Sequence, residues 1–248
     1  SQIVLFSIVP GLICLLAIAL FIQEVPGRKV LPAATRRPIW PARGELSPAY
    51  YRFLAAAGLF ALANSSDAFL LLRSHQMGVP AAGIPLLWAL LHLVKTSTSV
   101  LGGRLSDRIG RRPVLIAGWL WYGFVYAGFG LAPASAWAWI LFALYGLFFG
   151  LTEGAARAYV ADLVPKSTRG KAYGLLSMTE GLLALPASLL FGLLWEWQDS
   201  HAPPFVLSGI LAALAALILV QRNDKSGPPS VAGGHPRDPR DRFEATGG

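Results

Sequence analysis

The stretch GGRLSDRIGRRP, residues 102–113, separates two long apolar runs near the middle of the chain. The runs on either side, residues 84–102 and 114–132, are each long enough to cross the hydrocarbon core of a bilayer as a helix. Helices are expected because lipid offers the backbone no hydrogen-bond partner except its own groups. The polar stretch leaves almost no spare residues, so the sequence predicts a tight turn that joins two membrane-spanning helices.

Five further apolar runs of similar length occur along the chain, so seven membrane spans are expected in all. With 54% hydrophobic and 14% charged residues, the composition excludes an ordinary soluble domain, in which about a quarter of the residues are charged. We therefore predict an all-α integral membrane protein whose surroundings are the lipid bilayer. The expected spans are residues 3–22, 51–72, 84–102, 114–132, 137–161, 172–195 and 203–220.

The net charge of +8 comes from short basic blocks between the apolar runs, which indicates membrane orientation and no nucleic-acid partner. Lys and Arg gather in every second connection, at residues 23–50, 103–113 and 162–171, and again after Val220. These segments are expected on the cytoplasmic side. Residues 23–50 are predicted to form a basic linker and residues 221–248 a disordered cytoplasmic tail, because both are rich in Pro and Arg.

Glycines and charged residues follow one another in a fixed order along the turn. Glycine permits a tight turn and close helix approach, Asp107 is placed to accept backbone N–H groups at a helix N-terminus, and the arginines can pair with acidic groups. A basic loop that only follows the orientation rule is the alternative explanation for the arginines. In residue type and spacing the turn resembles the signature loop of the major facilitator superfamily at Gly103, Asp107, Arg108, Gly110, Arg111 and Arg112.

This resemblance implies an organisation and a role for the chain. Residues 1–22 would be the last helix of an N-terminal half, and residues 51–220 the six-helix C-terminal bundle of such a transporter. The turn would engage the missing N-terminal half at the cytoplasmic side and help to hold the outward-open state. A weaker match, PKSTRG at residues 165–170, carries Lys166 where the family usually has Glu. Because the chain begins at Ser1, without an initiator Met, we expect five further spans to precede it.

Ionisable residues inside membrane spans are costly and face a cavity or a partner. The first, fourth and seventh spans contain none, as the resemblance implies for helices on the lipid-facing outside. In one hypothesis Asp67 or Glu180 exchanges a proton, and Lys95 is its counter-ion or binds an anionic substrate. The alternatives are a fixed ion pair of Lys95 with Glu180 and a neutral, hydrogen-bonded His92. The predicted substrate or proton pathway comprises Asn64, Ser66, Asp67, His92, Lys95 and Glu180.

Other residues of the spans have simpler interpretations. Gly146, Gly150 and Gly154 repeat every four residues and predict close helix packing. Trp88, Trp119 and Trp121 fit lipid-facing anchors as well as they fit a substrate site. A cytoplasmic charge network near the turn is expected from Glu153, Arg157, Asp162 and Arg169.

The whole pattern favours transmembrane transport of a small solute by alternating access, with proton-coupled efflux as the leading hypothesis. Metabolite uptake, or a transport-inactive sensor or scaffold, is the alternative. Seven spans also describe rhodopsins, but the last span has no lysine for retinal. We expect no enzyme, cofactor or metal site, because catalytic motifs are missing and Cys14 is a single cysteine. The expected location is the bacterial cytoplasmic membrane.

Overall fold

The computed structural model describes residues 12–13, 15–17, 19–20, 40–42, 44–196 and 202–221, and it divides the chain into two compact units, Ser1–Trp40 and Pro41–Gly248. In the first unit the described residues between 12 and 20 are helical and exposed. They belong to the expected first span, most of which lies outside the described residues. Most of the expected linker at 23–50 and nearly all of the expected tail at 221–248 lie outside them as well.

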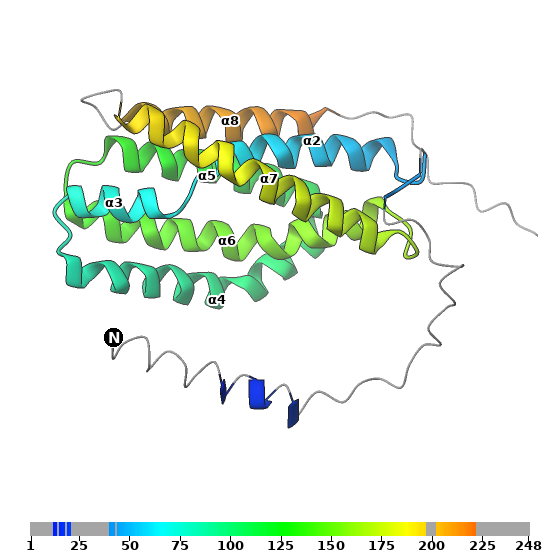
Figure 1. Ribbon diagram of the computed structural model, residues 1–248, viewed down its shortest axis with the longest axis horizontal. Coiled ribbons are helices and arrows are strands. Elements are labelled where there is room, and N and C mark those ends of the chain that lie inside the picture. Colours follow the sequence, from blue (N-terminus) through cyan, green and yellow to red (C-terminus); the bar gives the residue numbers. More distant parts are fainter. Residues whose placement is uncertain are drawn as a thin grey trace, which may run out of the picture. The chain divides into compact units, whose positions relative to one another are not determined.

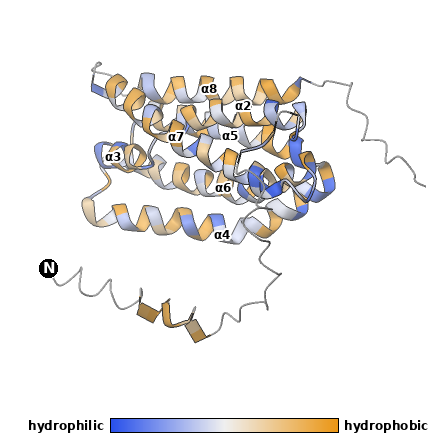
Figure 2. Ribbon diagram, turned by 45° about the vertical axis from the view of Figure 1, so that its right-hand side comes forward, coloured by the Kyte–Doolittle hydropathy of each residue, from blue (hydrophilic) through white to orange (hydrophobic). Residues whose placement is uncertain are grey.

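The described part of the second unit is helical, without strands, and six of its segments are long and apolar enough to cross a membrane. These six segments coincide with the six apolar runs expected to span the membrane between residues 51 and 220. Hydrophobic residues dominate the helices, and hydrophilic residues gather toward the ends of the bundle (Figure 2). The elements are α2 (Pro48–Ala63), α3 (Ala68–Gln76), the short 3-10 helix η2 (Ala81–Gly83), α4 (Ile84–Ile109), α5 (Arg111–Leu131), α6 (Ser135–Leu163), α7 (Arg169–Glu196) and α8 (Ala202–Val220).

The helices pack in pairs, α4 against α6 and α5 against α8, while α2 contacts both α7 and α8 (Figure 1). Helices α4 and α7 are the least covered, with 11% and 17% of their apolar windows buried. Helix α5, by contrast, has 50% buried because it packs against both α6 and α8. The expectation that the charge-free span 114–132 lies only on the outside is therefore incomplete, since one face of α5 reaches the interior.

The expected span 51–72 is two helices instead of one, because the polar run at residues 64–67 interrupts it. Helix α2 begins at Ser47, whose hydroxyl accepts a hydrogen bond from the Tyr50 backbone N–H at 3.1 Å. It ends at Asn64, and α3 begins after Asp67. The Ser66 backbone N–H, freed by the break, donates to the Ser188 hydroxyl of α7 at 3.2 Å. The break thus places four consecutive polar residues between two halves of one membrane span.

The turn predicted at residues 102–113 is much shorter than expected. Helix α4 continues to Ile109 and α5 begins at Arg111, so Gly110 alone separates them. Gly110 has a φ of 94°, a left-handed conformation that favours glycine. Gly103, Asp107 and Arg108 therefore lie on the last turns of a helix. The predicted tight turn is narrower still, because continued helix satisfies the backbone groups of these residues.

Two of the three predicted packing glycines lie where α4 and α6 approach most closely. A methyl group added at Gly146 would lie 2.6 Å from the Leu91 carbonyl oxygen, and one at Gly150 would lie 2.8 Å from the Lys95 carbonyl oxygen. A methyl group at Gly154 would meet nothing within 4 Å. The close approach predicted from the glycine spacing is confirmed at the first two positions and not at the third.

We expect Gly150→Ala to lower the thermal unfolding midpoint, because the added methyl group forces the α4 backbone away from α6. Overpacking of this kind costs about 1–3 kcal/mol. Gly154→Ala is the matched control on the same helix. It should leave stability unchanged or raise it by up to about 1 kcal/mol, since alanine is the better helix former. Equal effects of the two substitutions on the midpoint would contradict the close packing at Gly150.

Candidate functional site

A cavity of about 780 Å³ lies among α2, α4, α5, α6 and α7. Six of its lining residues are aromatic, and Phe60 stacks on Trp119 with ring centroids 4.8 Å apart. Trp119 is only 5% exposed, so of its two interpretations the lipid-facing anchor was wrong. The aromatic lining residues are Phe53, Phe60, Trp119, Phe148, Phe149 and Tyr173, and the charged ones are Lys95, Glu153, Arg157 and Glu180.

Lys95 and Glu153 form an ion pair across the α4–α6 contact, with 2.6 Å between Nζ and Oε2. Arg157 approaches the other carboxylate oxygen of Glu153 at 3.7 Å, and the Lys95 ammonium lies 5.0 Å from the centre of the Phe149 ring. Lys95 therefore pairs with Glu153, and the ion pair with Glu180 considered from the sequence does not form. Glu153 and Arg157 belong with the cavity, because their contacts are made there.

Glu180 lines the cavity from α7 and has no ion pair among the described residues. Its side chain is exposed, and Ser177 of the same helix lines the cavity beside it. Arg157 is the charged residue that acts on Glu180 electrostatically, although Arg157 is already engaged with Glu153. Glu180 is thus a carboxylate that faces the cavity without a fixed partner.

The remaining residues of the predicted pathway are distributed differently. Asn64 lines the cavity, and Asp67 lies at the break between α2 and α3, where it accepts a hydrogen bond of 2.7 Å from the Tyr145 hydroxyl. Ser66 is exposed, and its hydroxyl accepts a bond from the Ala68 backbone N–H. His92 is exposed as well, and its Nδ1 contacts the Trp88 carbonyl oxygen of its own helix at 2.9 Å. Neither Ser66 nor His92 lines the cavity.

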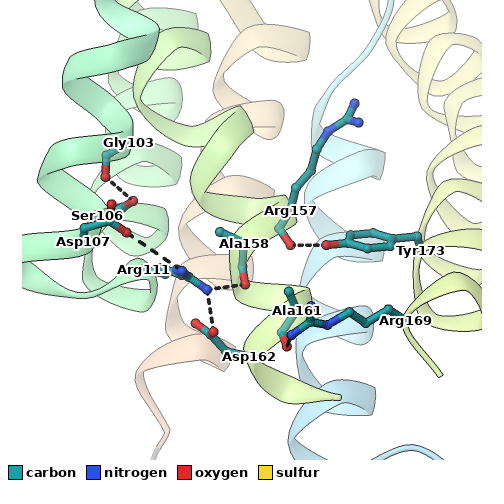
Figure 3. Close-up of polar contacts among 10 residues, drawn as sticks. All are labelled: Gly103, Ser106, Asp107, Arg111, Arg157, Ala158, Ala161, Asp162, Arg169 and Tyr173. Carbon is teal, nitrogen blue, oxygen red and sulfur yellow. Dashed lines mark hydrogen bonds and ion pairs between the residues drawn. The ribbon is translucent and has the colours of Figure 1, made fainter. Parts of the chain in front are cut away.

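Arginines tie the helices together at the end of the bundle where α4, α6 and α8 finish (Figure 3). Arg111 pairs with Asp162 at 2.5 Å, donates to the Ala158 carbonyl oxygen at 2.7 Å, and lies 3.9 Å from Asp107. Figure 3 shows the Arg157 side chain pointing away from this group.

Two more arginines bind the exposed carbonyl groups of helix ends nearby. Arg169 donates to the Ala161 carbonyl oxygen of α6 at 3.1 Å. Arg112 donates to the carbonyl oxygens of Leu219 and Val220 at 2.6 and 2.7 Å, which satisfies the C-terminal end of α8. Arg108 is exposed and has no hydrogen bond or ion pair among the described residues. Of the four arginines of the turn, Arg111 and Arg112 are structural, whereas Arg104 and Arg108 are exposed and have no partner among the described residues.

Sequence reasoning missed the aromatic walls of the cavity and the tyrosines around Asp67. Leu115, Trp119, Tyr122 and Tyr126 follow one another at spacings of four, three and four, and all are buried. This spacing defines one face of a helix, so it could have shown that α5 presents an aromatic face to the interior. Composition alone gave no such signal, because aromatic residues also mark membrane interfaces.

The fold and the cavity define a multi-pass integral membrane protein with a mainly apolar, partly charged cavity among its helices. A family model of the major facilitator superfamily matches residues 52–244. The chain belongs to the major facilitator superfamily, a family of transporters and not of enzymes.

Several longer proteins are similar to this chain. An uncharacterised MFS-type transporter of Methanocaldococcus jannaschii is 33% identical over 226 residues, which are 89% of this chain and 55% of that protein. The class C tetracycline resistance protein of Escherichia coli is 34% identical over 144 residues, 56% of this chain and 35% of that protein. The puromycin resistance protein of Streptomyces alboniger is 32% identical over 130 residues, 52% of this chain and 26% of that protein. The chain spans about half of the length of these relatives or less.

Proposed function

We propose that the chain forms the C-terminal half of a carrier that exports a small organic solute by alternating access in exchange for protons. The observation that carries the proposal is the cavity, which combines stacked aromatic walls with an unpaired carboxylate at Glu180. Aromatic walls suit an apolar or aromatic solute, and a few charged groups fix its orientation. Two of the relatives are named for resistance to tetracycline and puromycin, which supports efflux over uptake.

The partner in this proposal is an N-terminal half of the carrier that covers the open faces of α4 and α7. These two helices are the least covered of the bundle, yet they carry Lys95 and Glu180. Charged residues within a membrane face a cavity or a partner, so the open faces are better explained by a second half than by lipid. Asp107 and Arg108 would engage that half at the cytoplasmic membrane surface, as the family resemblance implies.

Glu180 carries the proton in this mechanism. When the cavity is open to water, the ionised carboxylate is solvated, and closing the cavity removes that water. Proton uptake cancels the charge, and the remaining Lys95–Glu153–Arg157 group keeps one positive charge in excess. A positively charged or neutral solute and the proton then compete for the same carboxylate, which gives exchange. Asp67, the other carboxylate considered for this role, does not line the cavity.

We expect Glu180→Gln to uncouple export from the proton gradient, because glutamine cannot take up and release a proton. In proteoliposomes that contain the full-length protein, gradient-driven export of a fluorescent organic cation should fall by about 100-fold, within the usual range of coupling between two ligands. Exchange of labelled for unlabelled solute without a gradient should persist.

Glu196→Gln at the end of the same helix is the control and should keep gradient-driven export. A Glu180→Gln carrier that still follows the gradient would contradict the role of Glu180. Gradient-driven accumulation in the opposite direction would indicate uptake of a solute. The absence of any flux with a broad panel of solutes would indicate a sensor or scaffold.

A further inference from the structure

A cluster of oxygen atoms surrounds the break between α2 and α3 and touches the lining of the cavity through Asn64 alone. The Tyr145 hydroxyl lies 2.7 Å from Asp67 Oδ1 and 3.5 Å from Asn64 Oδ1. The rings of Tyr122 and Tyr126 stack at 4.1 Å, and the Tyr126 ring lies 5.9 Å from that of Tyr145. Three helices, α5, α6 and the interrupted span, thus bring one carboxylate, one amide and several hydroxyl groups to one place.

Two hydroxyl groups of this cluster are buried without a hydrogen-bond partner. They belong to Tyr126, which is 0% exposed, and to Ser65, which is 5% exposed. Ser65, Tyr122 and Tyr145 lie close enough to act on the Tyr126 hydroxyl, but none of the described residues forms a hydrogen bond with it. An unsatisfied buried hydroxyl costs about 1–3 kcal/mol, so such groups normally meet a bound water, ion or ligand. Here two such groups belong to the same cluster.

The charge of Asp67 is also left without a fixed partner. Asp67 has no ion pair among the described residues. The basic side chains nearest in effect are His92 and Lys95, but Lys95 is paired with Glu153 and His92 is bonded to its own helix. A carboxylate at this depth in a membrane span needs a compensating positive charge.

We propose that this cluster is a sodium site, with Asp67, Asn64, Ser65, Tyr126 and Tyr145 supplying the oxygen ligands. Unwound segments of membrane helices bind sodium in other transporter folds because their freed polar groups converge there. One carboxylate matches one monovalent charge, whereas divalent ions prefer more carboxylates, and the described residues contain no group of three acidic, His or Cys side chains. A water molecule would leave the charge of Asp67 uncompensated. A proton would occupy one oxygen and leave the Tyr126 and Ser65 hydroxyls unsatisfied.

The sodium site goes beyond the proposed function and does not depend on it. Proton exchange was assigned to Glu180 of the cavity, and the sodium site involves a different carboxylate on a different helix. Sodium binding can be measured on the protein without transport or an organic solute. Failure of one proposal therefore leaves the other intact.

The test is binding of radiolabelled sodium to the full-length protein in nanodiscs, together with the thermal unfolding midpoint in sodium, potassium and choline chloride at equal ionic strength. We expect saturable sodium binding and a sodium-specific rise of the midpoint. Asp67→Asn should abolish both. Tyr126→Phe and Ser65→Ala should weaken sodium affinity by about 10- to 100-fold, the range seen when groups that support a metal site are removed.

Tyr50→Phe is the matched control, because it also removes a buried tyrosine hydroxyl, one that donates to the Ala172 carbonyl oxygen at 2.7 Å. It should bind sodium like the unaltered protein. Even if Asp67→Asn fails to fold, the Tyr126→Phe variant decides the question, since loss of an unpartnered hydroxyl should not harm folding. Sodium binding that is missing, or equal in Tyr126→Phe and the unaltered protein, overturns the proposal. Stabilisation by acid but not by sodium also overturns it and indicates a proton site.

Discussion

Lys95→Met should abolish transport and destabilise the bundle, because it leaves Glu153 in the cavity with only the longer contact to Arg157. Removing one member of a fully buried pair costs about 3–5 kcal/mol. Lys95 and Glu153 are 34% and 45% exposed, so we expect a smaller loss of about 1–2 kcal/mol in the free energy of unfolding. Export should fall by about 100-fold, since a charge left uncompensated in the cavity disturbs solute binding in both states of the cycle.

The charge-swapped double variant, Lys95→Glu with Glu153→Lys, distinguishes two roles of Lys95. In one, Lys95 only holds α4 against α6, and in the other it binds the solute. We expect the swap to recover most of the thermal stability but not the export, because the ammonium then extends from α6 instead of α4. Recovery of both would show that Lys95 only holds the helices together. Lys166→Met, at an exposed turn residue, is the control for loss of a lysine and should change neither measurement.

The helices could be predicted from the sequence because a membrane span depends mainly on the length of one continuous apolar run. Apolar length located the six runs between residues 51 and 220, and the charge of the connections predicted their orientation. The same reasoning did not predict that α4 continues through residues 102–109. A helix can extend from lipid into water, and no apolar run then marks where it ends. Reasoning from the sequence located the polar interruption at residues 64–67, but it did not predict that the span is divided there into α2 and α3.

The site was only partly predictable, for a different reason. Charged residues within spans are rare, so Lys95, Asp67 and Glu180 could be singled out by type alone. Their partners depend on which helices touch: Lys95 meets Glu153 because Gly150 lets α4 approach α6. Tyr145 of α6 reaches Asp67 at the break between α2 and α3, and no spacing along one helix encodes such a contact. Pairing in a bundle is a property of packing and not of periodicity.

Arg111→Ala should produce the largest stability loss among the arginines of the α4–α5 corner. The Arg111 side chain is 27% exposed and joins Asp162, the Ala158 carbonyl oxygen and, more weakly, Asp107. Hydrogen bonds to charged groups contribute about 1.5–3 kcal/mol each, so we expect a loss of about 3 kcal/mol in the free energy of unfolding. Arg111→Lys should recover less than half of it, because an ammonium cannot serve carboxylate and carbonyl in the same fork geometry.

Arg108→Ala, three residues away, is the matched comparison because Arg108 has no partner within the described part of the chain. It should leave the unfolding midpoint unchanged and lower the rate of export by about tenfold, since its expected partner lies in the other half of the carrier. Apparent affinity for the solute should stay the same in both variants. An Arg108→Ala carrier with altered affinity and normal turnover would contradict a role in the conformational cycle. Equal stability losses at Arg108 and Arg111 would show that the corner acts as one structural unit, with no residue reserved for a partner.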